Sequence, residues 1–116
     1  MAKATDLPIY RVAYELLQLI MTLTQQFPRG YRQGLARDIC AEAQAIVTCI
    51  FRANCTTDKA PVLEQLRERY ETLRLQLRLS KDLRLISAAQ FGATVVLSDA
   101  VGKQMTGWLN YAKGRA

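Results

Sequence analysis

Residues 63–86 read LEQLRERYETLRLQLRLSKDLRLI, and this stretch holds more leucine than one face of a helix can carry. A first apolar stripe, at spacings of three and four, consists of Leu63, Leu66, Tyr70, Leu73 and Leu77. A second stripe, turned by about 160° around the helix axis, consists of Leu75, Leu79, Leu83 and Ile86. A chain of 116 residues forms one core, which one stripe is enough to close. The second stripe therefore predicts an oligomer interface.

A row of basic residues lies between the two stripes. It consists of Arg67, Arg74, Arg78 and Lys81, at intervals of seven, four and three residues. Asp82 is the only acidic residue three or four positions after any of the last three, so we expect these side chains to be largely unpaired. An unpaired basic row favours an anionic ligand, although a solvated basic face has the same composition. The net charge of +6 and the pI near 9.6 also favour an anionic partner such as nucleic acid.

The helical period extends over most of the chain and predicts four helices, at about residues 6–27, 33–54, 59–86 and 87–113. Residues 73–79 alternate with the period of a strand. We reject a strand because strong helix formers precede them and the chain offers no second strand to pair with. Four helices with short connections predict an all-α fold, an antiparallel up-down-up-down four-helix bundle that forms a single domain over residues 1–116.

Helix ends are indicated by local signals. Asp6 and Pro8 mark the first start, and Pro28 with Gly30 marks the first end. The later starts are marked by Asp58, followed by Pro61, and by Ser87. Glycine inside a helix is unfavourable, so a helical glycine predicts a close helix crossing; the last helix has three, Gly92, Gly102 and Gly107.

The composition excludes several classes of enzyme. The chain has no histidine, which removes Ser-His and Cys-His nucleophile pairs and histidine-ligated metal sites. Asp38 and Glu42 lie one turn apart, but di-iron bundles use Glu-x-x-His motifs. No phosphate-binding glycine loop or nucleophile elbow is found. We therefore expect a protein that is not an enzyme and that uses no cofactor or metal.

The remaining signals concern the cell compartment. The three cysteines have no metal-ligand spacing and are expected to be reduced packing residues: Cys40, Cys49 and Cys55. No apolar run is long enough to cross a bilayer, and the N-terminus has no signal-peptide pattern. We expect a soluble cytoplasmic protein with no membrane partner.

Several short motifs follow one another in a specific order along the four predicted helices. They are Phe27-Pro28-Arg29, Leu35-Ala36-Arg37-Asp38, Leu73-Arg74-x-x-Leu77-Arg78, Val101-Gly102-Lys103 and Gly107-Trp108. This set resembles the Avd family over residues 9–112. These proteins are the accessory variability determinants of diversity-generating retroelements. They are related to four-helix-bundle proteins encoded in ribosomal RNA intervening sequences.

The resemblance implies an assembly and a role. Family members form homopentameric barrels with a positively charged surface, associate with the reverse transcriptase of the retroelement and bind nucleic acid. They support mutagenic synthesis of complementary DNA from a template RNA. Carried over by position, Arg74 and Arg78 belong to the surface that engages the transcriptase or the nucleic acid, and Arg37 matches a further basic position. Lys103 stands where the family commonly has arginine. The full set of candidate binding residues is Arg74, Arg78, Lys81, Arg67, Arg37 and Arg84.

Two other functions are compatible with the same sequence. One is a structural four-helix bundle of the intervening-sequence type, without a transcriptase partner. The other is a stand-alone RNA-binding module. The neighbouring genes discriminate between the retroelement role and the intervening-sequence role, because a reverse transcriptase gene with a template repeat indicates a retroelement.

Overall fold

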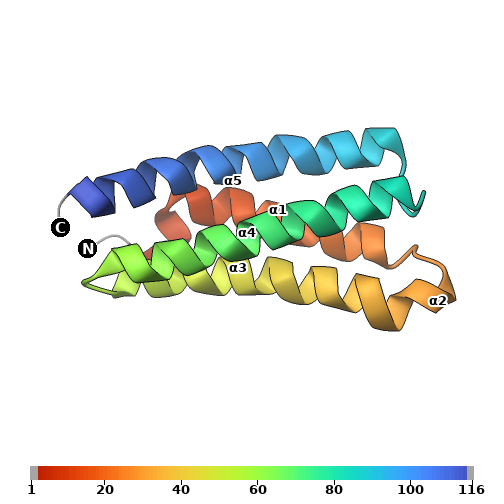
Figure 1. The fold of residues 1–116 in the computed structure, drawn as a ribbon, viewed down its shortest axis with the longest axis horizontal. Coiled ribbons are helices and arrows are strands. Elements are labelled where there is room, and N and C mark those ends of the chain that lie inside the picture. The colour runs from red at the N-terminus through yellow and green to blue at the C-terminus, as the bar shows by residue number, and fades with distance from the viewer. Residues whose placement is uncertain (1–2, 115–116) are drawn as a thin grey trace.

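The computed structural model describes residues 3–114 as an elongated all-α bundle, with principal extents of 46 × 22 × 21 Å. Its four long helical segments run antiparallel to their neighbours along the chain (Figure 1). A short 3₁₀ helix, Ala4–Asp6, precedes them. The elements that follow are α1 (Pro8–Thr24), α2 (Arg29–Tyr31), a π-helical segment (Arg32–Ala36), α3 (Arg37–Cys55), α4 (Lys59–Asp82) and α5 (Ala88–Gly114). The predicted four-helix bundle is confirmed.

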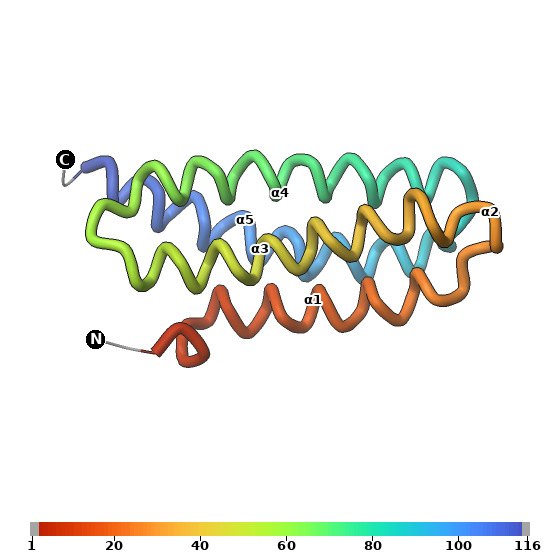
Figure 2. Tube along the Cα trace, turned by 90° about the horizontal axis from the view of Figure 1, so that it is seen from below, coloured from red at the N-terminus to blue at the C-terminus, as the bar shows by residue number. Residues whose placement is uncertain are grey.

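The long helices form a closed ring in which α1 and α4 each pack against both α3 and α5. The N-terminal end, the C-terminal end and the α3–α4 connection lie at one end of the bundle (Figure 1). Figure 2 shows α2 at the opposite end. The α4–α5 connection lies at that same end (Figure 1). Within residues 3–114 no helix has both the length and the hydropathy needed to cross a bilayer.

The core is built from aliphatic side chains at helical spacing. The first stripe of α4 is buried, as predicted, because it faces the centre of the ring. Leu73 and Leu77 are buried whereas Leu75 and Leu79 are exposed, as a helix requires at these spacings. The largest fully buried hydrophobic side chains are Leu16, Ile20, Phe27, Ile39, Ile46, Ile50, Leu63, Leu66, Leu73 and Val101.

The predicted end of the third helix at residue 86 is wrong, because α4 ends at Asp82. The amide of Leu85 donates to the carbonyl of Ser80 (2.8 Å) and that of Arg84 to Lys81 (2.9 Å), which is the Schellman pattern of a helix end. Arg84 takes the left-handed conformation that this pattern requires, with φ 63°. Arginine at this position gives no sequence signal for a helix end, since glycine is the usual residue there.

The early end of α4 changes the predicted second stripe. Leu83 lies just beyond the helix and remains exposed. Ile86 lies on the connection, where only 6% of its surface is exposed, and joins the core beside Phe27 and Leu77. Placing Ile86 in an oligomer interface is therefore wrong, because its side chain is used within the chain's own core.

The first two predicted helices also differ from the structure at their ends. The segment predicted as one helix over 6–27 is the 3₁₀ helix followed by α1, which begins at Pro8 and ends at Thr24. Phe27 lies after that end but is still buried. The second predicted helix, 33–54, begins four residues earlier, with α2 at Arg29, and includes the π-helical segment. A π-helical turn inside a helix is rare and has no reliable sequence signal.

Side chains stabilise two of the other helix ends. At the start of α5 the amide of Gln90 donates to Oγ of Ser87 (3.0 Å), and the amide of Ser87 donates to Oε1 of Gln90 (2.8 Å). This capping box satisfies two amides that a helix start leaves without partners. At the end of α3, Nζ of Lys59 donates to three carbonyl oxygens, those of Ala53, Asn54 and Thr56.

Candidate binding groove between α4 and α5

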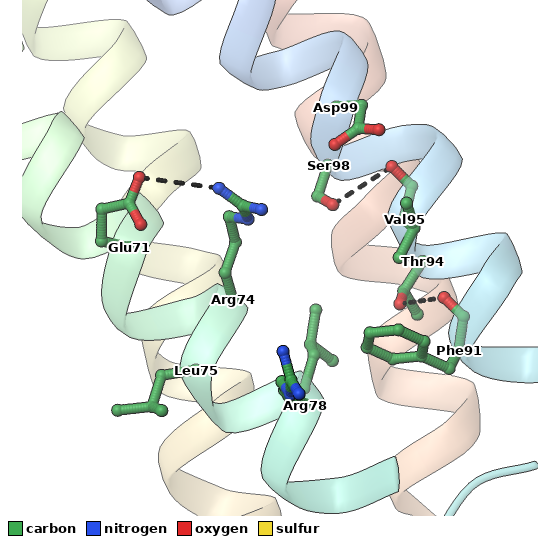
Figure 3. A pocket seen from close by; sticks show the side chains of 10 residues that line it. Glu71, Arg74, Leu75, Arg78, Phe91, Thr94, Val95, Ser98 and Asp99 are labelled. Atoms are coloured by element: carbon green, nitrogen blue, oxygen red, sulfur yellow. Dashed lines mark hydrogen bonds and ion pairs between the residues drawn. The ribbon is translucent and has the colours of Figure 1, made fainter. Parts of the chain in front are cut away.

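A groove runs along the surface where α4 packs against α5. Its first compartment, of about 350 Å³, is lined by Glu71, Arg74, Leu75, Leu77, Arg78, Phe91, Thr94, Val95, Ser98 and Asp99 (Figure 3). Its second, of about 570 Å³, is lined by Arg67, Tyr70, Glu71, Arg74, Asp99, Gly102, Lys103, Met105 and Thr106. The two compartments share Glu71, Arg74 and Asp99, so they form one continuous groove.

Helical spacing places the predicted basic row along this groove. Arg67, Arg74 and Arg78 are separated by seven and four residues, which keeps them on the side of α4 that faces α5. Lys81 follows one turn later, with Nζ 5.0 Å from the centre of the Phe91 ring. Lys103 approaches from α5. The groove therefore brings together three of the six candidate binding residues, and a fourth, Lys81, lies over the ring of Phe91 in its lining.

The arginines of the groove have more partners than predicted. The Arg74 guanidinium lies 3.8 Å from Glu71, three residues earlier, and 5.6 Å from the centre of the Tyr70 ring. Arg78 lies 3.9 Å from Asp82. The expectation that Arg74 is unpaired was wrong because it considered only acidic residues that follow it in the chain.

These ion pairs leave the arginines available to a ligand. Both partners of each pair are more than half exposed, and an exposed ion pair contributes about 0 to 1 kcal/mol. Arg67 has a comparable pair with Glu64 at 3.3 Å. An incoming carboxylate or phosphate can therefore replace these contacts at little cost.

The groove carries both signs of charge and an apolar part. Glu71 and Asp99 lie among its basic side chains, and Phe91 and Val95 add apolar surface. Figure 3 shows Arg74 extending from α4 towards the part of α5 that carries Ser98 and Asp99. Such a lining offers donors, acceptors and apolar contacts within one site, a combination that suits a polypeptide segment better than a bare phosphate chain.

Tyr70 forms part of the wall and is fixed by α5. Its hydroxyl donates to the carbonyl oxygen of Ser98 at 2.9 Å. Burial raises the pKa of the Tyr70 hydroxyl, so the phenol keeps its proton and remains a donor at neutral pH. A Cβ atom at Gly102 would collide with the Tyr70 hydroxyl and lie 2.8 Å from its ring carbon Cζ. Gly102 thus makes room for this contact.

The other two helical glycines do not mark close crossings. A Cβ atom at Gly92 or Gly107 would meet nothing within 4 Å. Both residues lie on the exposed side of α5. The close-crossing prediction is therefore confirmed at Gly102 and wrong at Gly92 and Gly107.

Sequence reasoning missed the α5 wall of the groove. Phe91, Val95, Asp99 and Thr106 recur at spacings that keep them near one face of a helix, and that spacing was available as a signal. Only the packing of α5 against α4 shows that Asp99 lies among the arginines. The remaining two candidates, Arg37 and Arg84, lie outside this groove, towards the end of the bundle where α2 lies.

Exposed apolar side chains lie on α4, on the residue that follows it and on α5, and one of them, Leu75, also lines the groove. Leu75 is 69% exposed and Val96 is 70% exposed, and Leu79 and Leu83 are exposed as well. Side chains of this size are seldom so exposed in a group unless another surface covers them. The predicted oligomer interface at Leu75, Leu79 and Leu83 thus remains a prediction.

The fold and the groove define a basic four-helix-bundle protein with a groove of mixed charge between α4 and α5 and no candidate metal cluster within residues 3–114. The bAvd-like family model matches residues 9–112. The chain therefore belongs to the bAvd-like family, as the order of its motifs suggested. No curated protein matches the sequence.

Proposed function

We propose that this protein is a non-enzymatic accessory subunit of a diversity-generating retroelement. In this role it binds the reverse transcriptase and nucleic acid and supports mutagenic synthesis of complementary DNA. Membership of the bAvd-like family supports the role. The observation that carries the proposal is the continuous groove between α4 and α5, which joins Arg67, Arg74 and Arg78 to acidic and apolar side chains.

In this proposal the groove is the docking site for a segment of the reverse transcriptase. In the unbound protein Arg74 pairs with Glu71, and Arg78 pairs with Asp82. The carboxylates of an acidic protein segment would take the place of these two partners. Apolar side chains of the segment would pack on Phe91 and Val95. Charge pairing then sets the register of the segment, and apolar burial supplies affinity.

We further propose that the protein functions as a homo-oligomer, and as a pentamer if it follows the assembly that the resemblance to the Avd family implies. The exposed leucines of α4 and Val96 of α5 would form the contact between copies. Repetition of the subunit would place several copies of the groove on one particle. A partner that contacts more than one groove would gain affinity through the high local concentration of sites.

The double change Arg74→Ala and Arg78→Ala tests the docking site. We expect co-purification of the retroelement's reverse transcriptase with this protein to fall at least about tenfold, since each charged contact at an interface contributes about 1 to 3 kcal/mol. Helicity measured by circular dichroism should not change, because both side chains are exposed.

The matched control changes Arg11 and Arg52 to alanine, which removes two exposed cations from α1 and α3, outside the groove. The control should retain the reverse transcriptase. Equal retention by both double variants would contradict the docking site. Inspection of the adjacent genes gives a second check, because a retroelement requires a reverse transcriptase gene and a template repeat.

A further inference from the structure

The positive charge of the molecule is concentrated at one end of the bundle. We define the α2 end as residues 25–38 and 78–90, which contain the α1–α2 and α4–α5 connections (Figures 1 and 2). Its acidic residues are Asp38 and Asp82, against six basic residues: Arg29, Arg32, Arg37, Arg78, Lys81 and Arg84. The α2 end therefore carries four of the six net positive charges of the chain. The nearby parts of α1 and α5, residues 16–24 and 88–98, contain no charged residue to offset it.

The two connections meet through the core, so they form one end of the bundle. Phe27 of the α1–α2 connection and Ile86 of the α4–α5 connection line the same small internal cavity, together with Ile39 and Ser80. The bundle is 22 × 21 Å in cross-section, so the cations of the two connections are distributed over an end face about 20 Å across. That width is about two Debye lengths at physiological salt, so their fields overlap in part.

Arg29, Arg37 and Arg84 of the α2 end differ from the arginines of the groove because they have no acidic partner within residues 3–114. The ion pairs of residues 3–114 include Arg67, Arg74 and Arg78 but not Arg29, Arg37 or Arg84. These last three side chains are exposed. Their guanidinium groups can contact a strongly anionic ligand without first breaking an ion pair within the chain.

Two arginines of the α2 end, Arg32 and Arg84, are held in defined conformations. Nε of Arg32 donates to the carbonyl oxygen of Phe27 at 3.1 Å, which fixes the side chain at the start of the π-helical segment. Arg84 occupies a left-handed position where glycine is preferred. A residue kept in an unfavourable conformation, and a π-helical turn, are both found more often at functional sites than elsewhere.

The same end presents an aromatic ring among the cations. Tyr31, at the end of α2 and between Arg29 and Arg32, is 37% exposed. An exposed aromatic side chain among arginines can stack on an unpaired base. The bases of a duplex are not open to such stacking, because each is already stacked on its neighbours. A face about 20 Å across accommodates a few nucleotides, and folds that bind single strands commonly occupy about 4 to 16.

We propose that the α2 end is a binding site for single-stranded nucleic acid, in which Arg29, Arg37 and Arg84 contact phosphates and Tyr31 stacks on a base. This inference rests on the proposed function for its choice of nucleic acid over other polyanions. It assigns two ligands to two surfaces that share only Arg78: the groove between α4 and α5 takes the protein partner, and the α2 end takes the nucleic acid.

The test measures binding of a fluorescently labelled single-stranded RNA of about 16 nucleotides by anisotropy, at several salt concentrations. The end variant carries Arg29→Gln, Arg37→Gln and Arg84→Gln. The control variant carries Lys3→Gln, Arg11→Gln and Arg52→Gln, which removes the same charge from exposed positions outside the α2 end. Arg32 is left unchanged because its hydrogen bond to Phe27 supports the local fold.

We expect the end variant to bind at least about tenfold more weakly, while the control variant changes by about twofold or less. The plot of log affinity against log salt should become shallower by about two for the end variant, since each single-strand phosphate contact contributes about 0.7. Tyr31→Ala should weaken binding to the single strand by about tenfold and leave binding to a duplex unchanged. The double variant Arg29→Gln and Arg37→Gln, which leaves the α4–α5 connection intact, should show the same direction of change.

Three results would overturn the inference: equal losses in the end and control variants, loss in the Arg74→Ala and Arg78→Ala variant alone, or no binding of the RNA by the unchanged protein at low salt. Association with the reverse transcriptase is measured separately, by co-purification. If that association persists while the α2 end proves inactive, the inference fails and the proposed function stands. If association is absent while the α2 end binds RNA, the proposed function fails instead.

Discussion

At the scale of single residues, the contact between Gly102 and Tyr70 shows how one small residue shapes the groove. Tyr70 crosses from α4 to α5 and donates to the carbonyl oxygen of Ser98, and it reaches that atom only because position 102 has no side chain. The Tyr70 ring in turn lies 5.6 Å from the Arg74 guanidinium. The position of a candidate binding residue therefore depends on a glycine of the facing helix.

Gly102→Ala should destabilise the protein by about 1 to 2 kcal/mol. Alanine is favoured over glycine in a helix by about 1 kcal/mol, but overpacking costs about 1 to 3 kcal/mol, and the displaced Tyr70 also loses its hydrogen bond to Ser98. The free energy of unfolding in urea measures the change. Gly107→Ala is the matched control and should stabilise by up to about 1 kcal/mol, because no atom lies within 4 Å of the new Cβ. Equal stabilisation by both changes would contradict the proposed contact.

At the scale of elements, α4 shows which features of the fold can be predicted from its sequence. The buried stripe from Leu63 to Leu77 follows from spacing alone, because only one face of the helix can meet the core. The pairing of Arg74 with Glu71 also follows from the sequence, since a helix brings residues three apart together in either direction. The α5 wall of the groove was not, because Asp99 joins the arginines only through tertiary packing.

The end of α4 at Asp82 could not be predicted because its left-handed residue is Arg84 rather than glycine. Leu83 and Ile86 continue the apolar spacing past the true end, so the sequence imitates a longer helix. Ile86 then enters the core from a connection, where helical spacing no longer determines the direction of a side chain. The π-helical segment at residues 32–36 could not be predicted either, because its residues are also compatible with an ordinary α-helix.

Arg84→Gly should stabilise the protein by about 0.5 to 1 kcal/mol. A left-handed conformation costs a residue with a side chain about 1 to 2 kcal/mol, and the greater freedom of glycine in the unfolded chain cancels part of the gain. The midpoint of thermal or urea unfolding measures the change. Arg84→Ala is the control and should give no comparable gain, since alanine has the same conformational cost. Loss of stability in Arg84→Gly would contradict the Schellman end of α4.

At the scale of the whole molecule, three surfaces of different chemistry lie on one rod about 46 Å long. The groove between α4 and α5 has both signs of charge, the α2 end is basic, and the outside of α4 and α5 exposes leucine and valine. In the proposed function the groove binds the reverse transcriptase, and the exposed leucines and valine bind further copies of this chain. In the further inference the α2 end binds the nucleic acid. All three sets contain residues selected from the sequence, whereas the division of the basic candidates between the first and the second comes from the structure.

Association of this protein with the reverse transcriptase can be measured through the mass of the complex in solution. Light scattering after size-exclusion chromatography would measure this protein alone, the retroelement's reverse transcriptase alone and their mixture. We expect this protein alone to have a multiple of its 13.1 kDa subunit mass, and the mixture to elute as one species that contains both proteins. Separate elution of the two proteins at unchanged masses, at micromolar concentration and low salt, would contradict it.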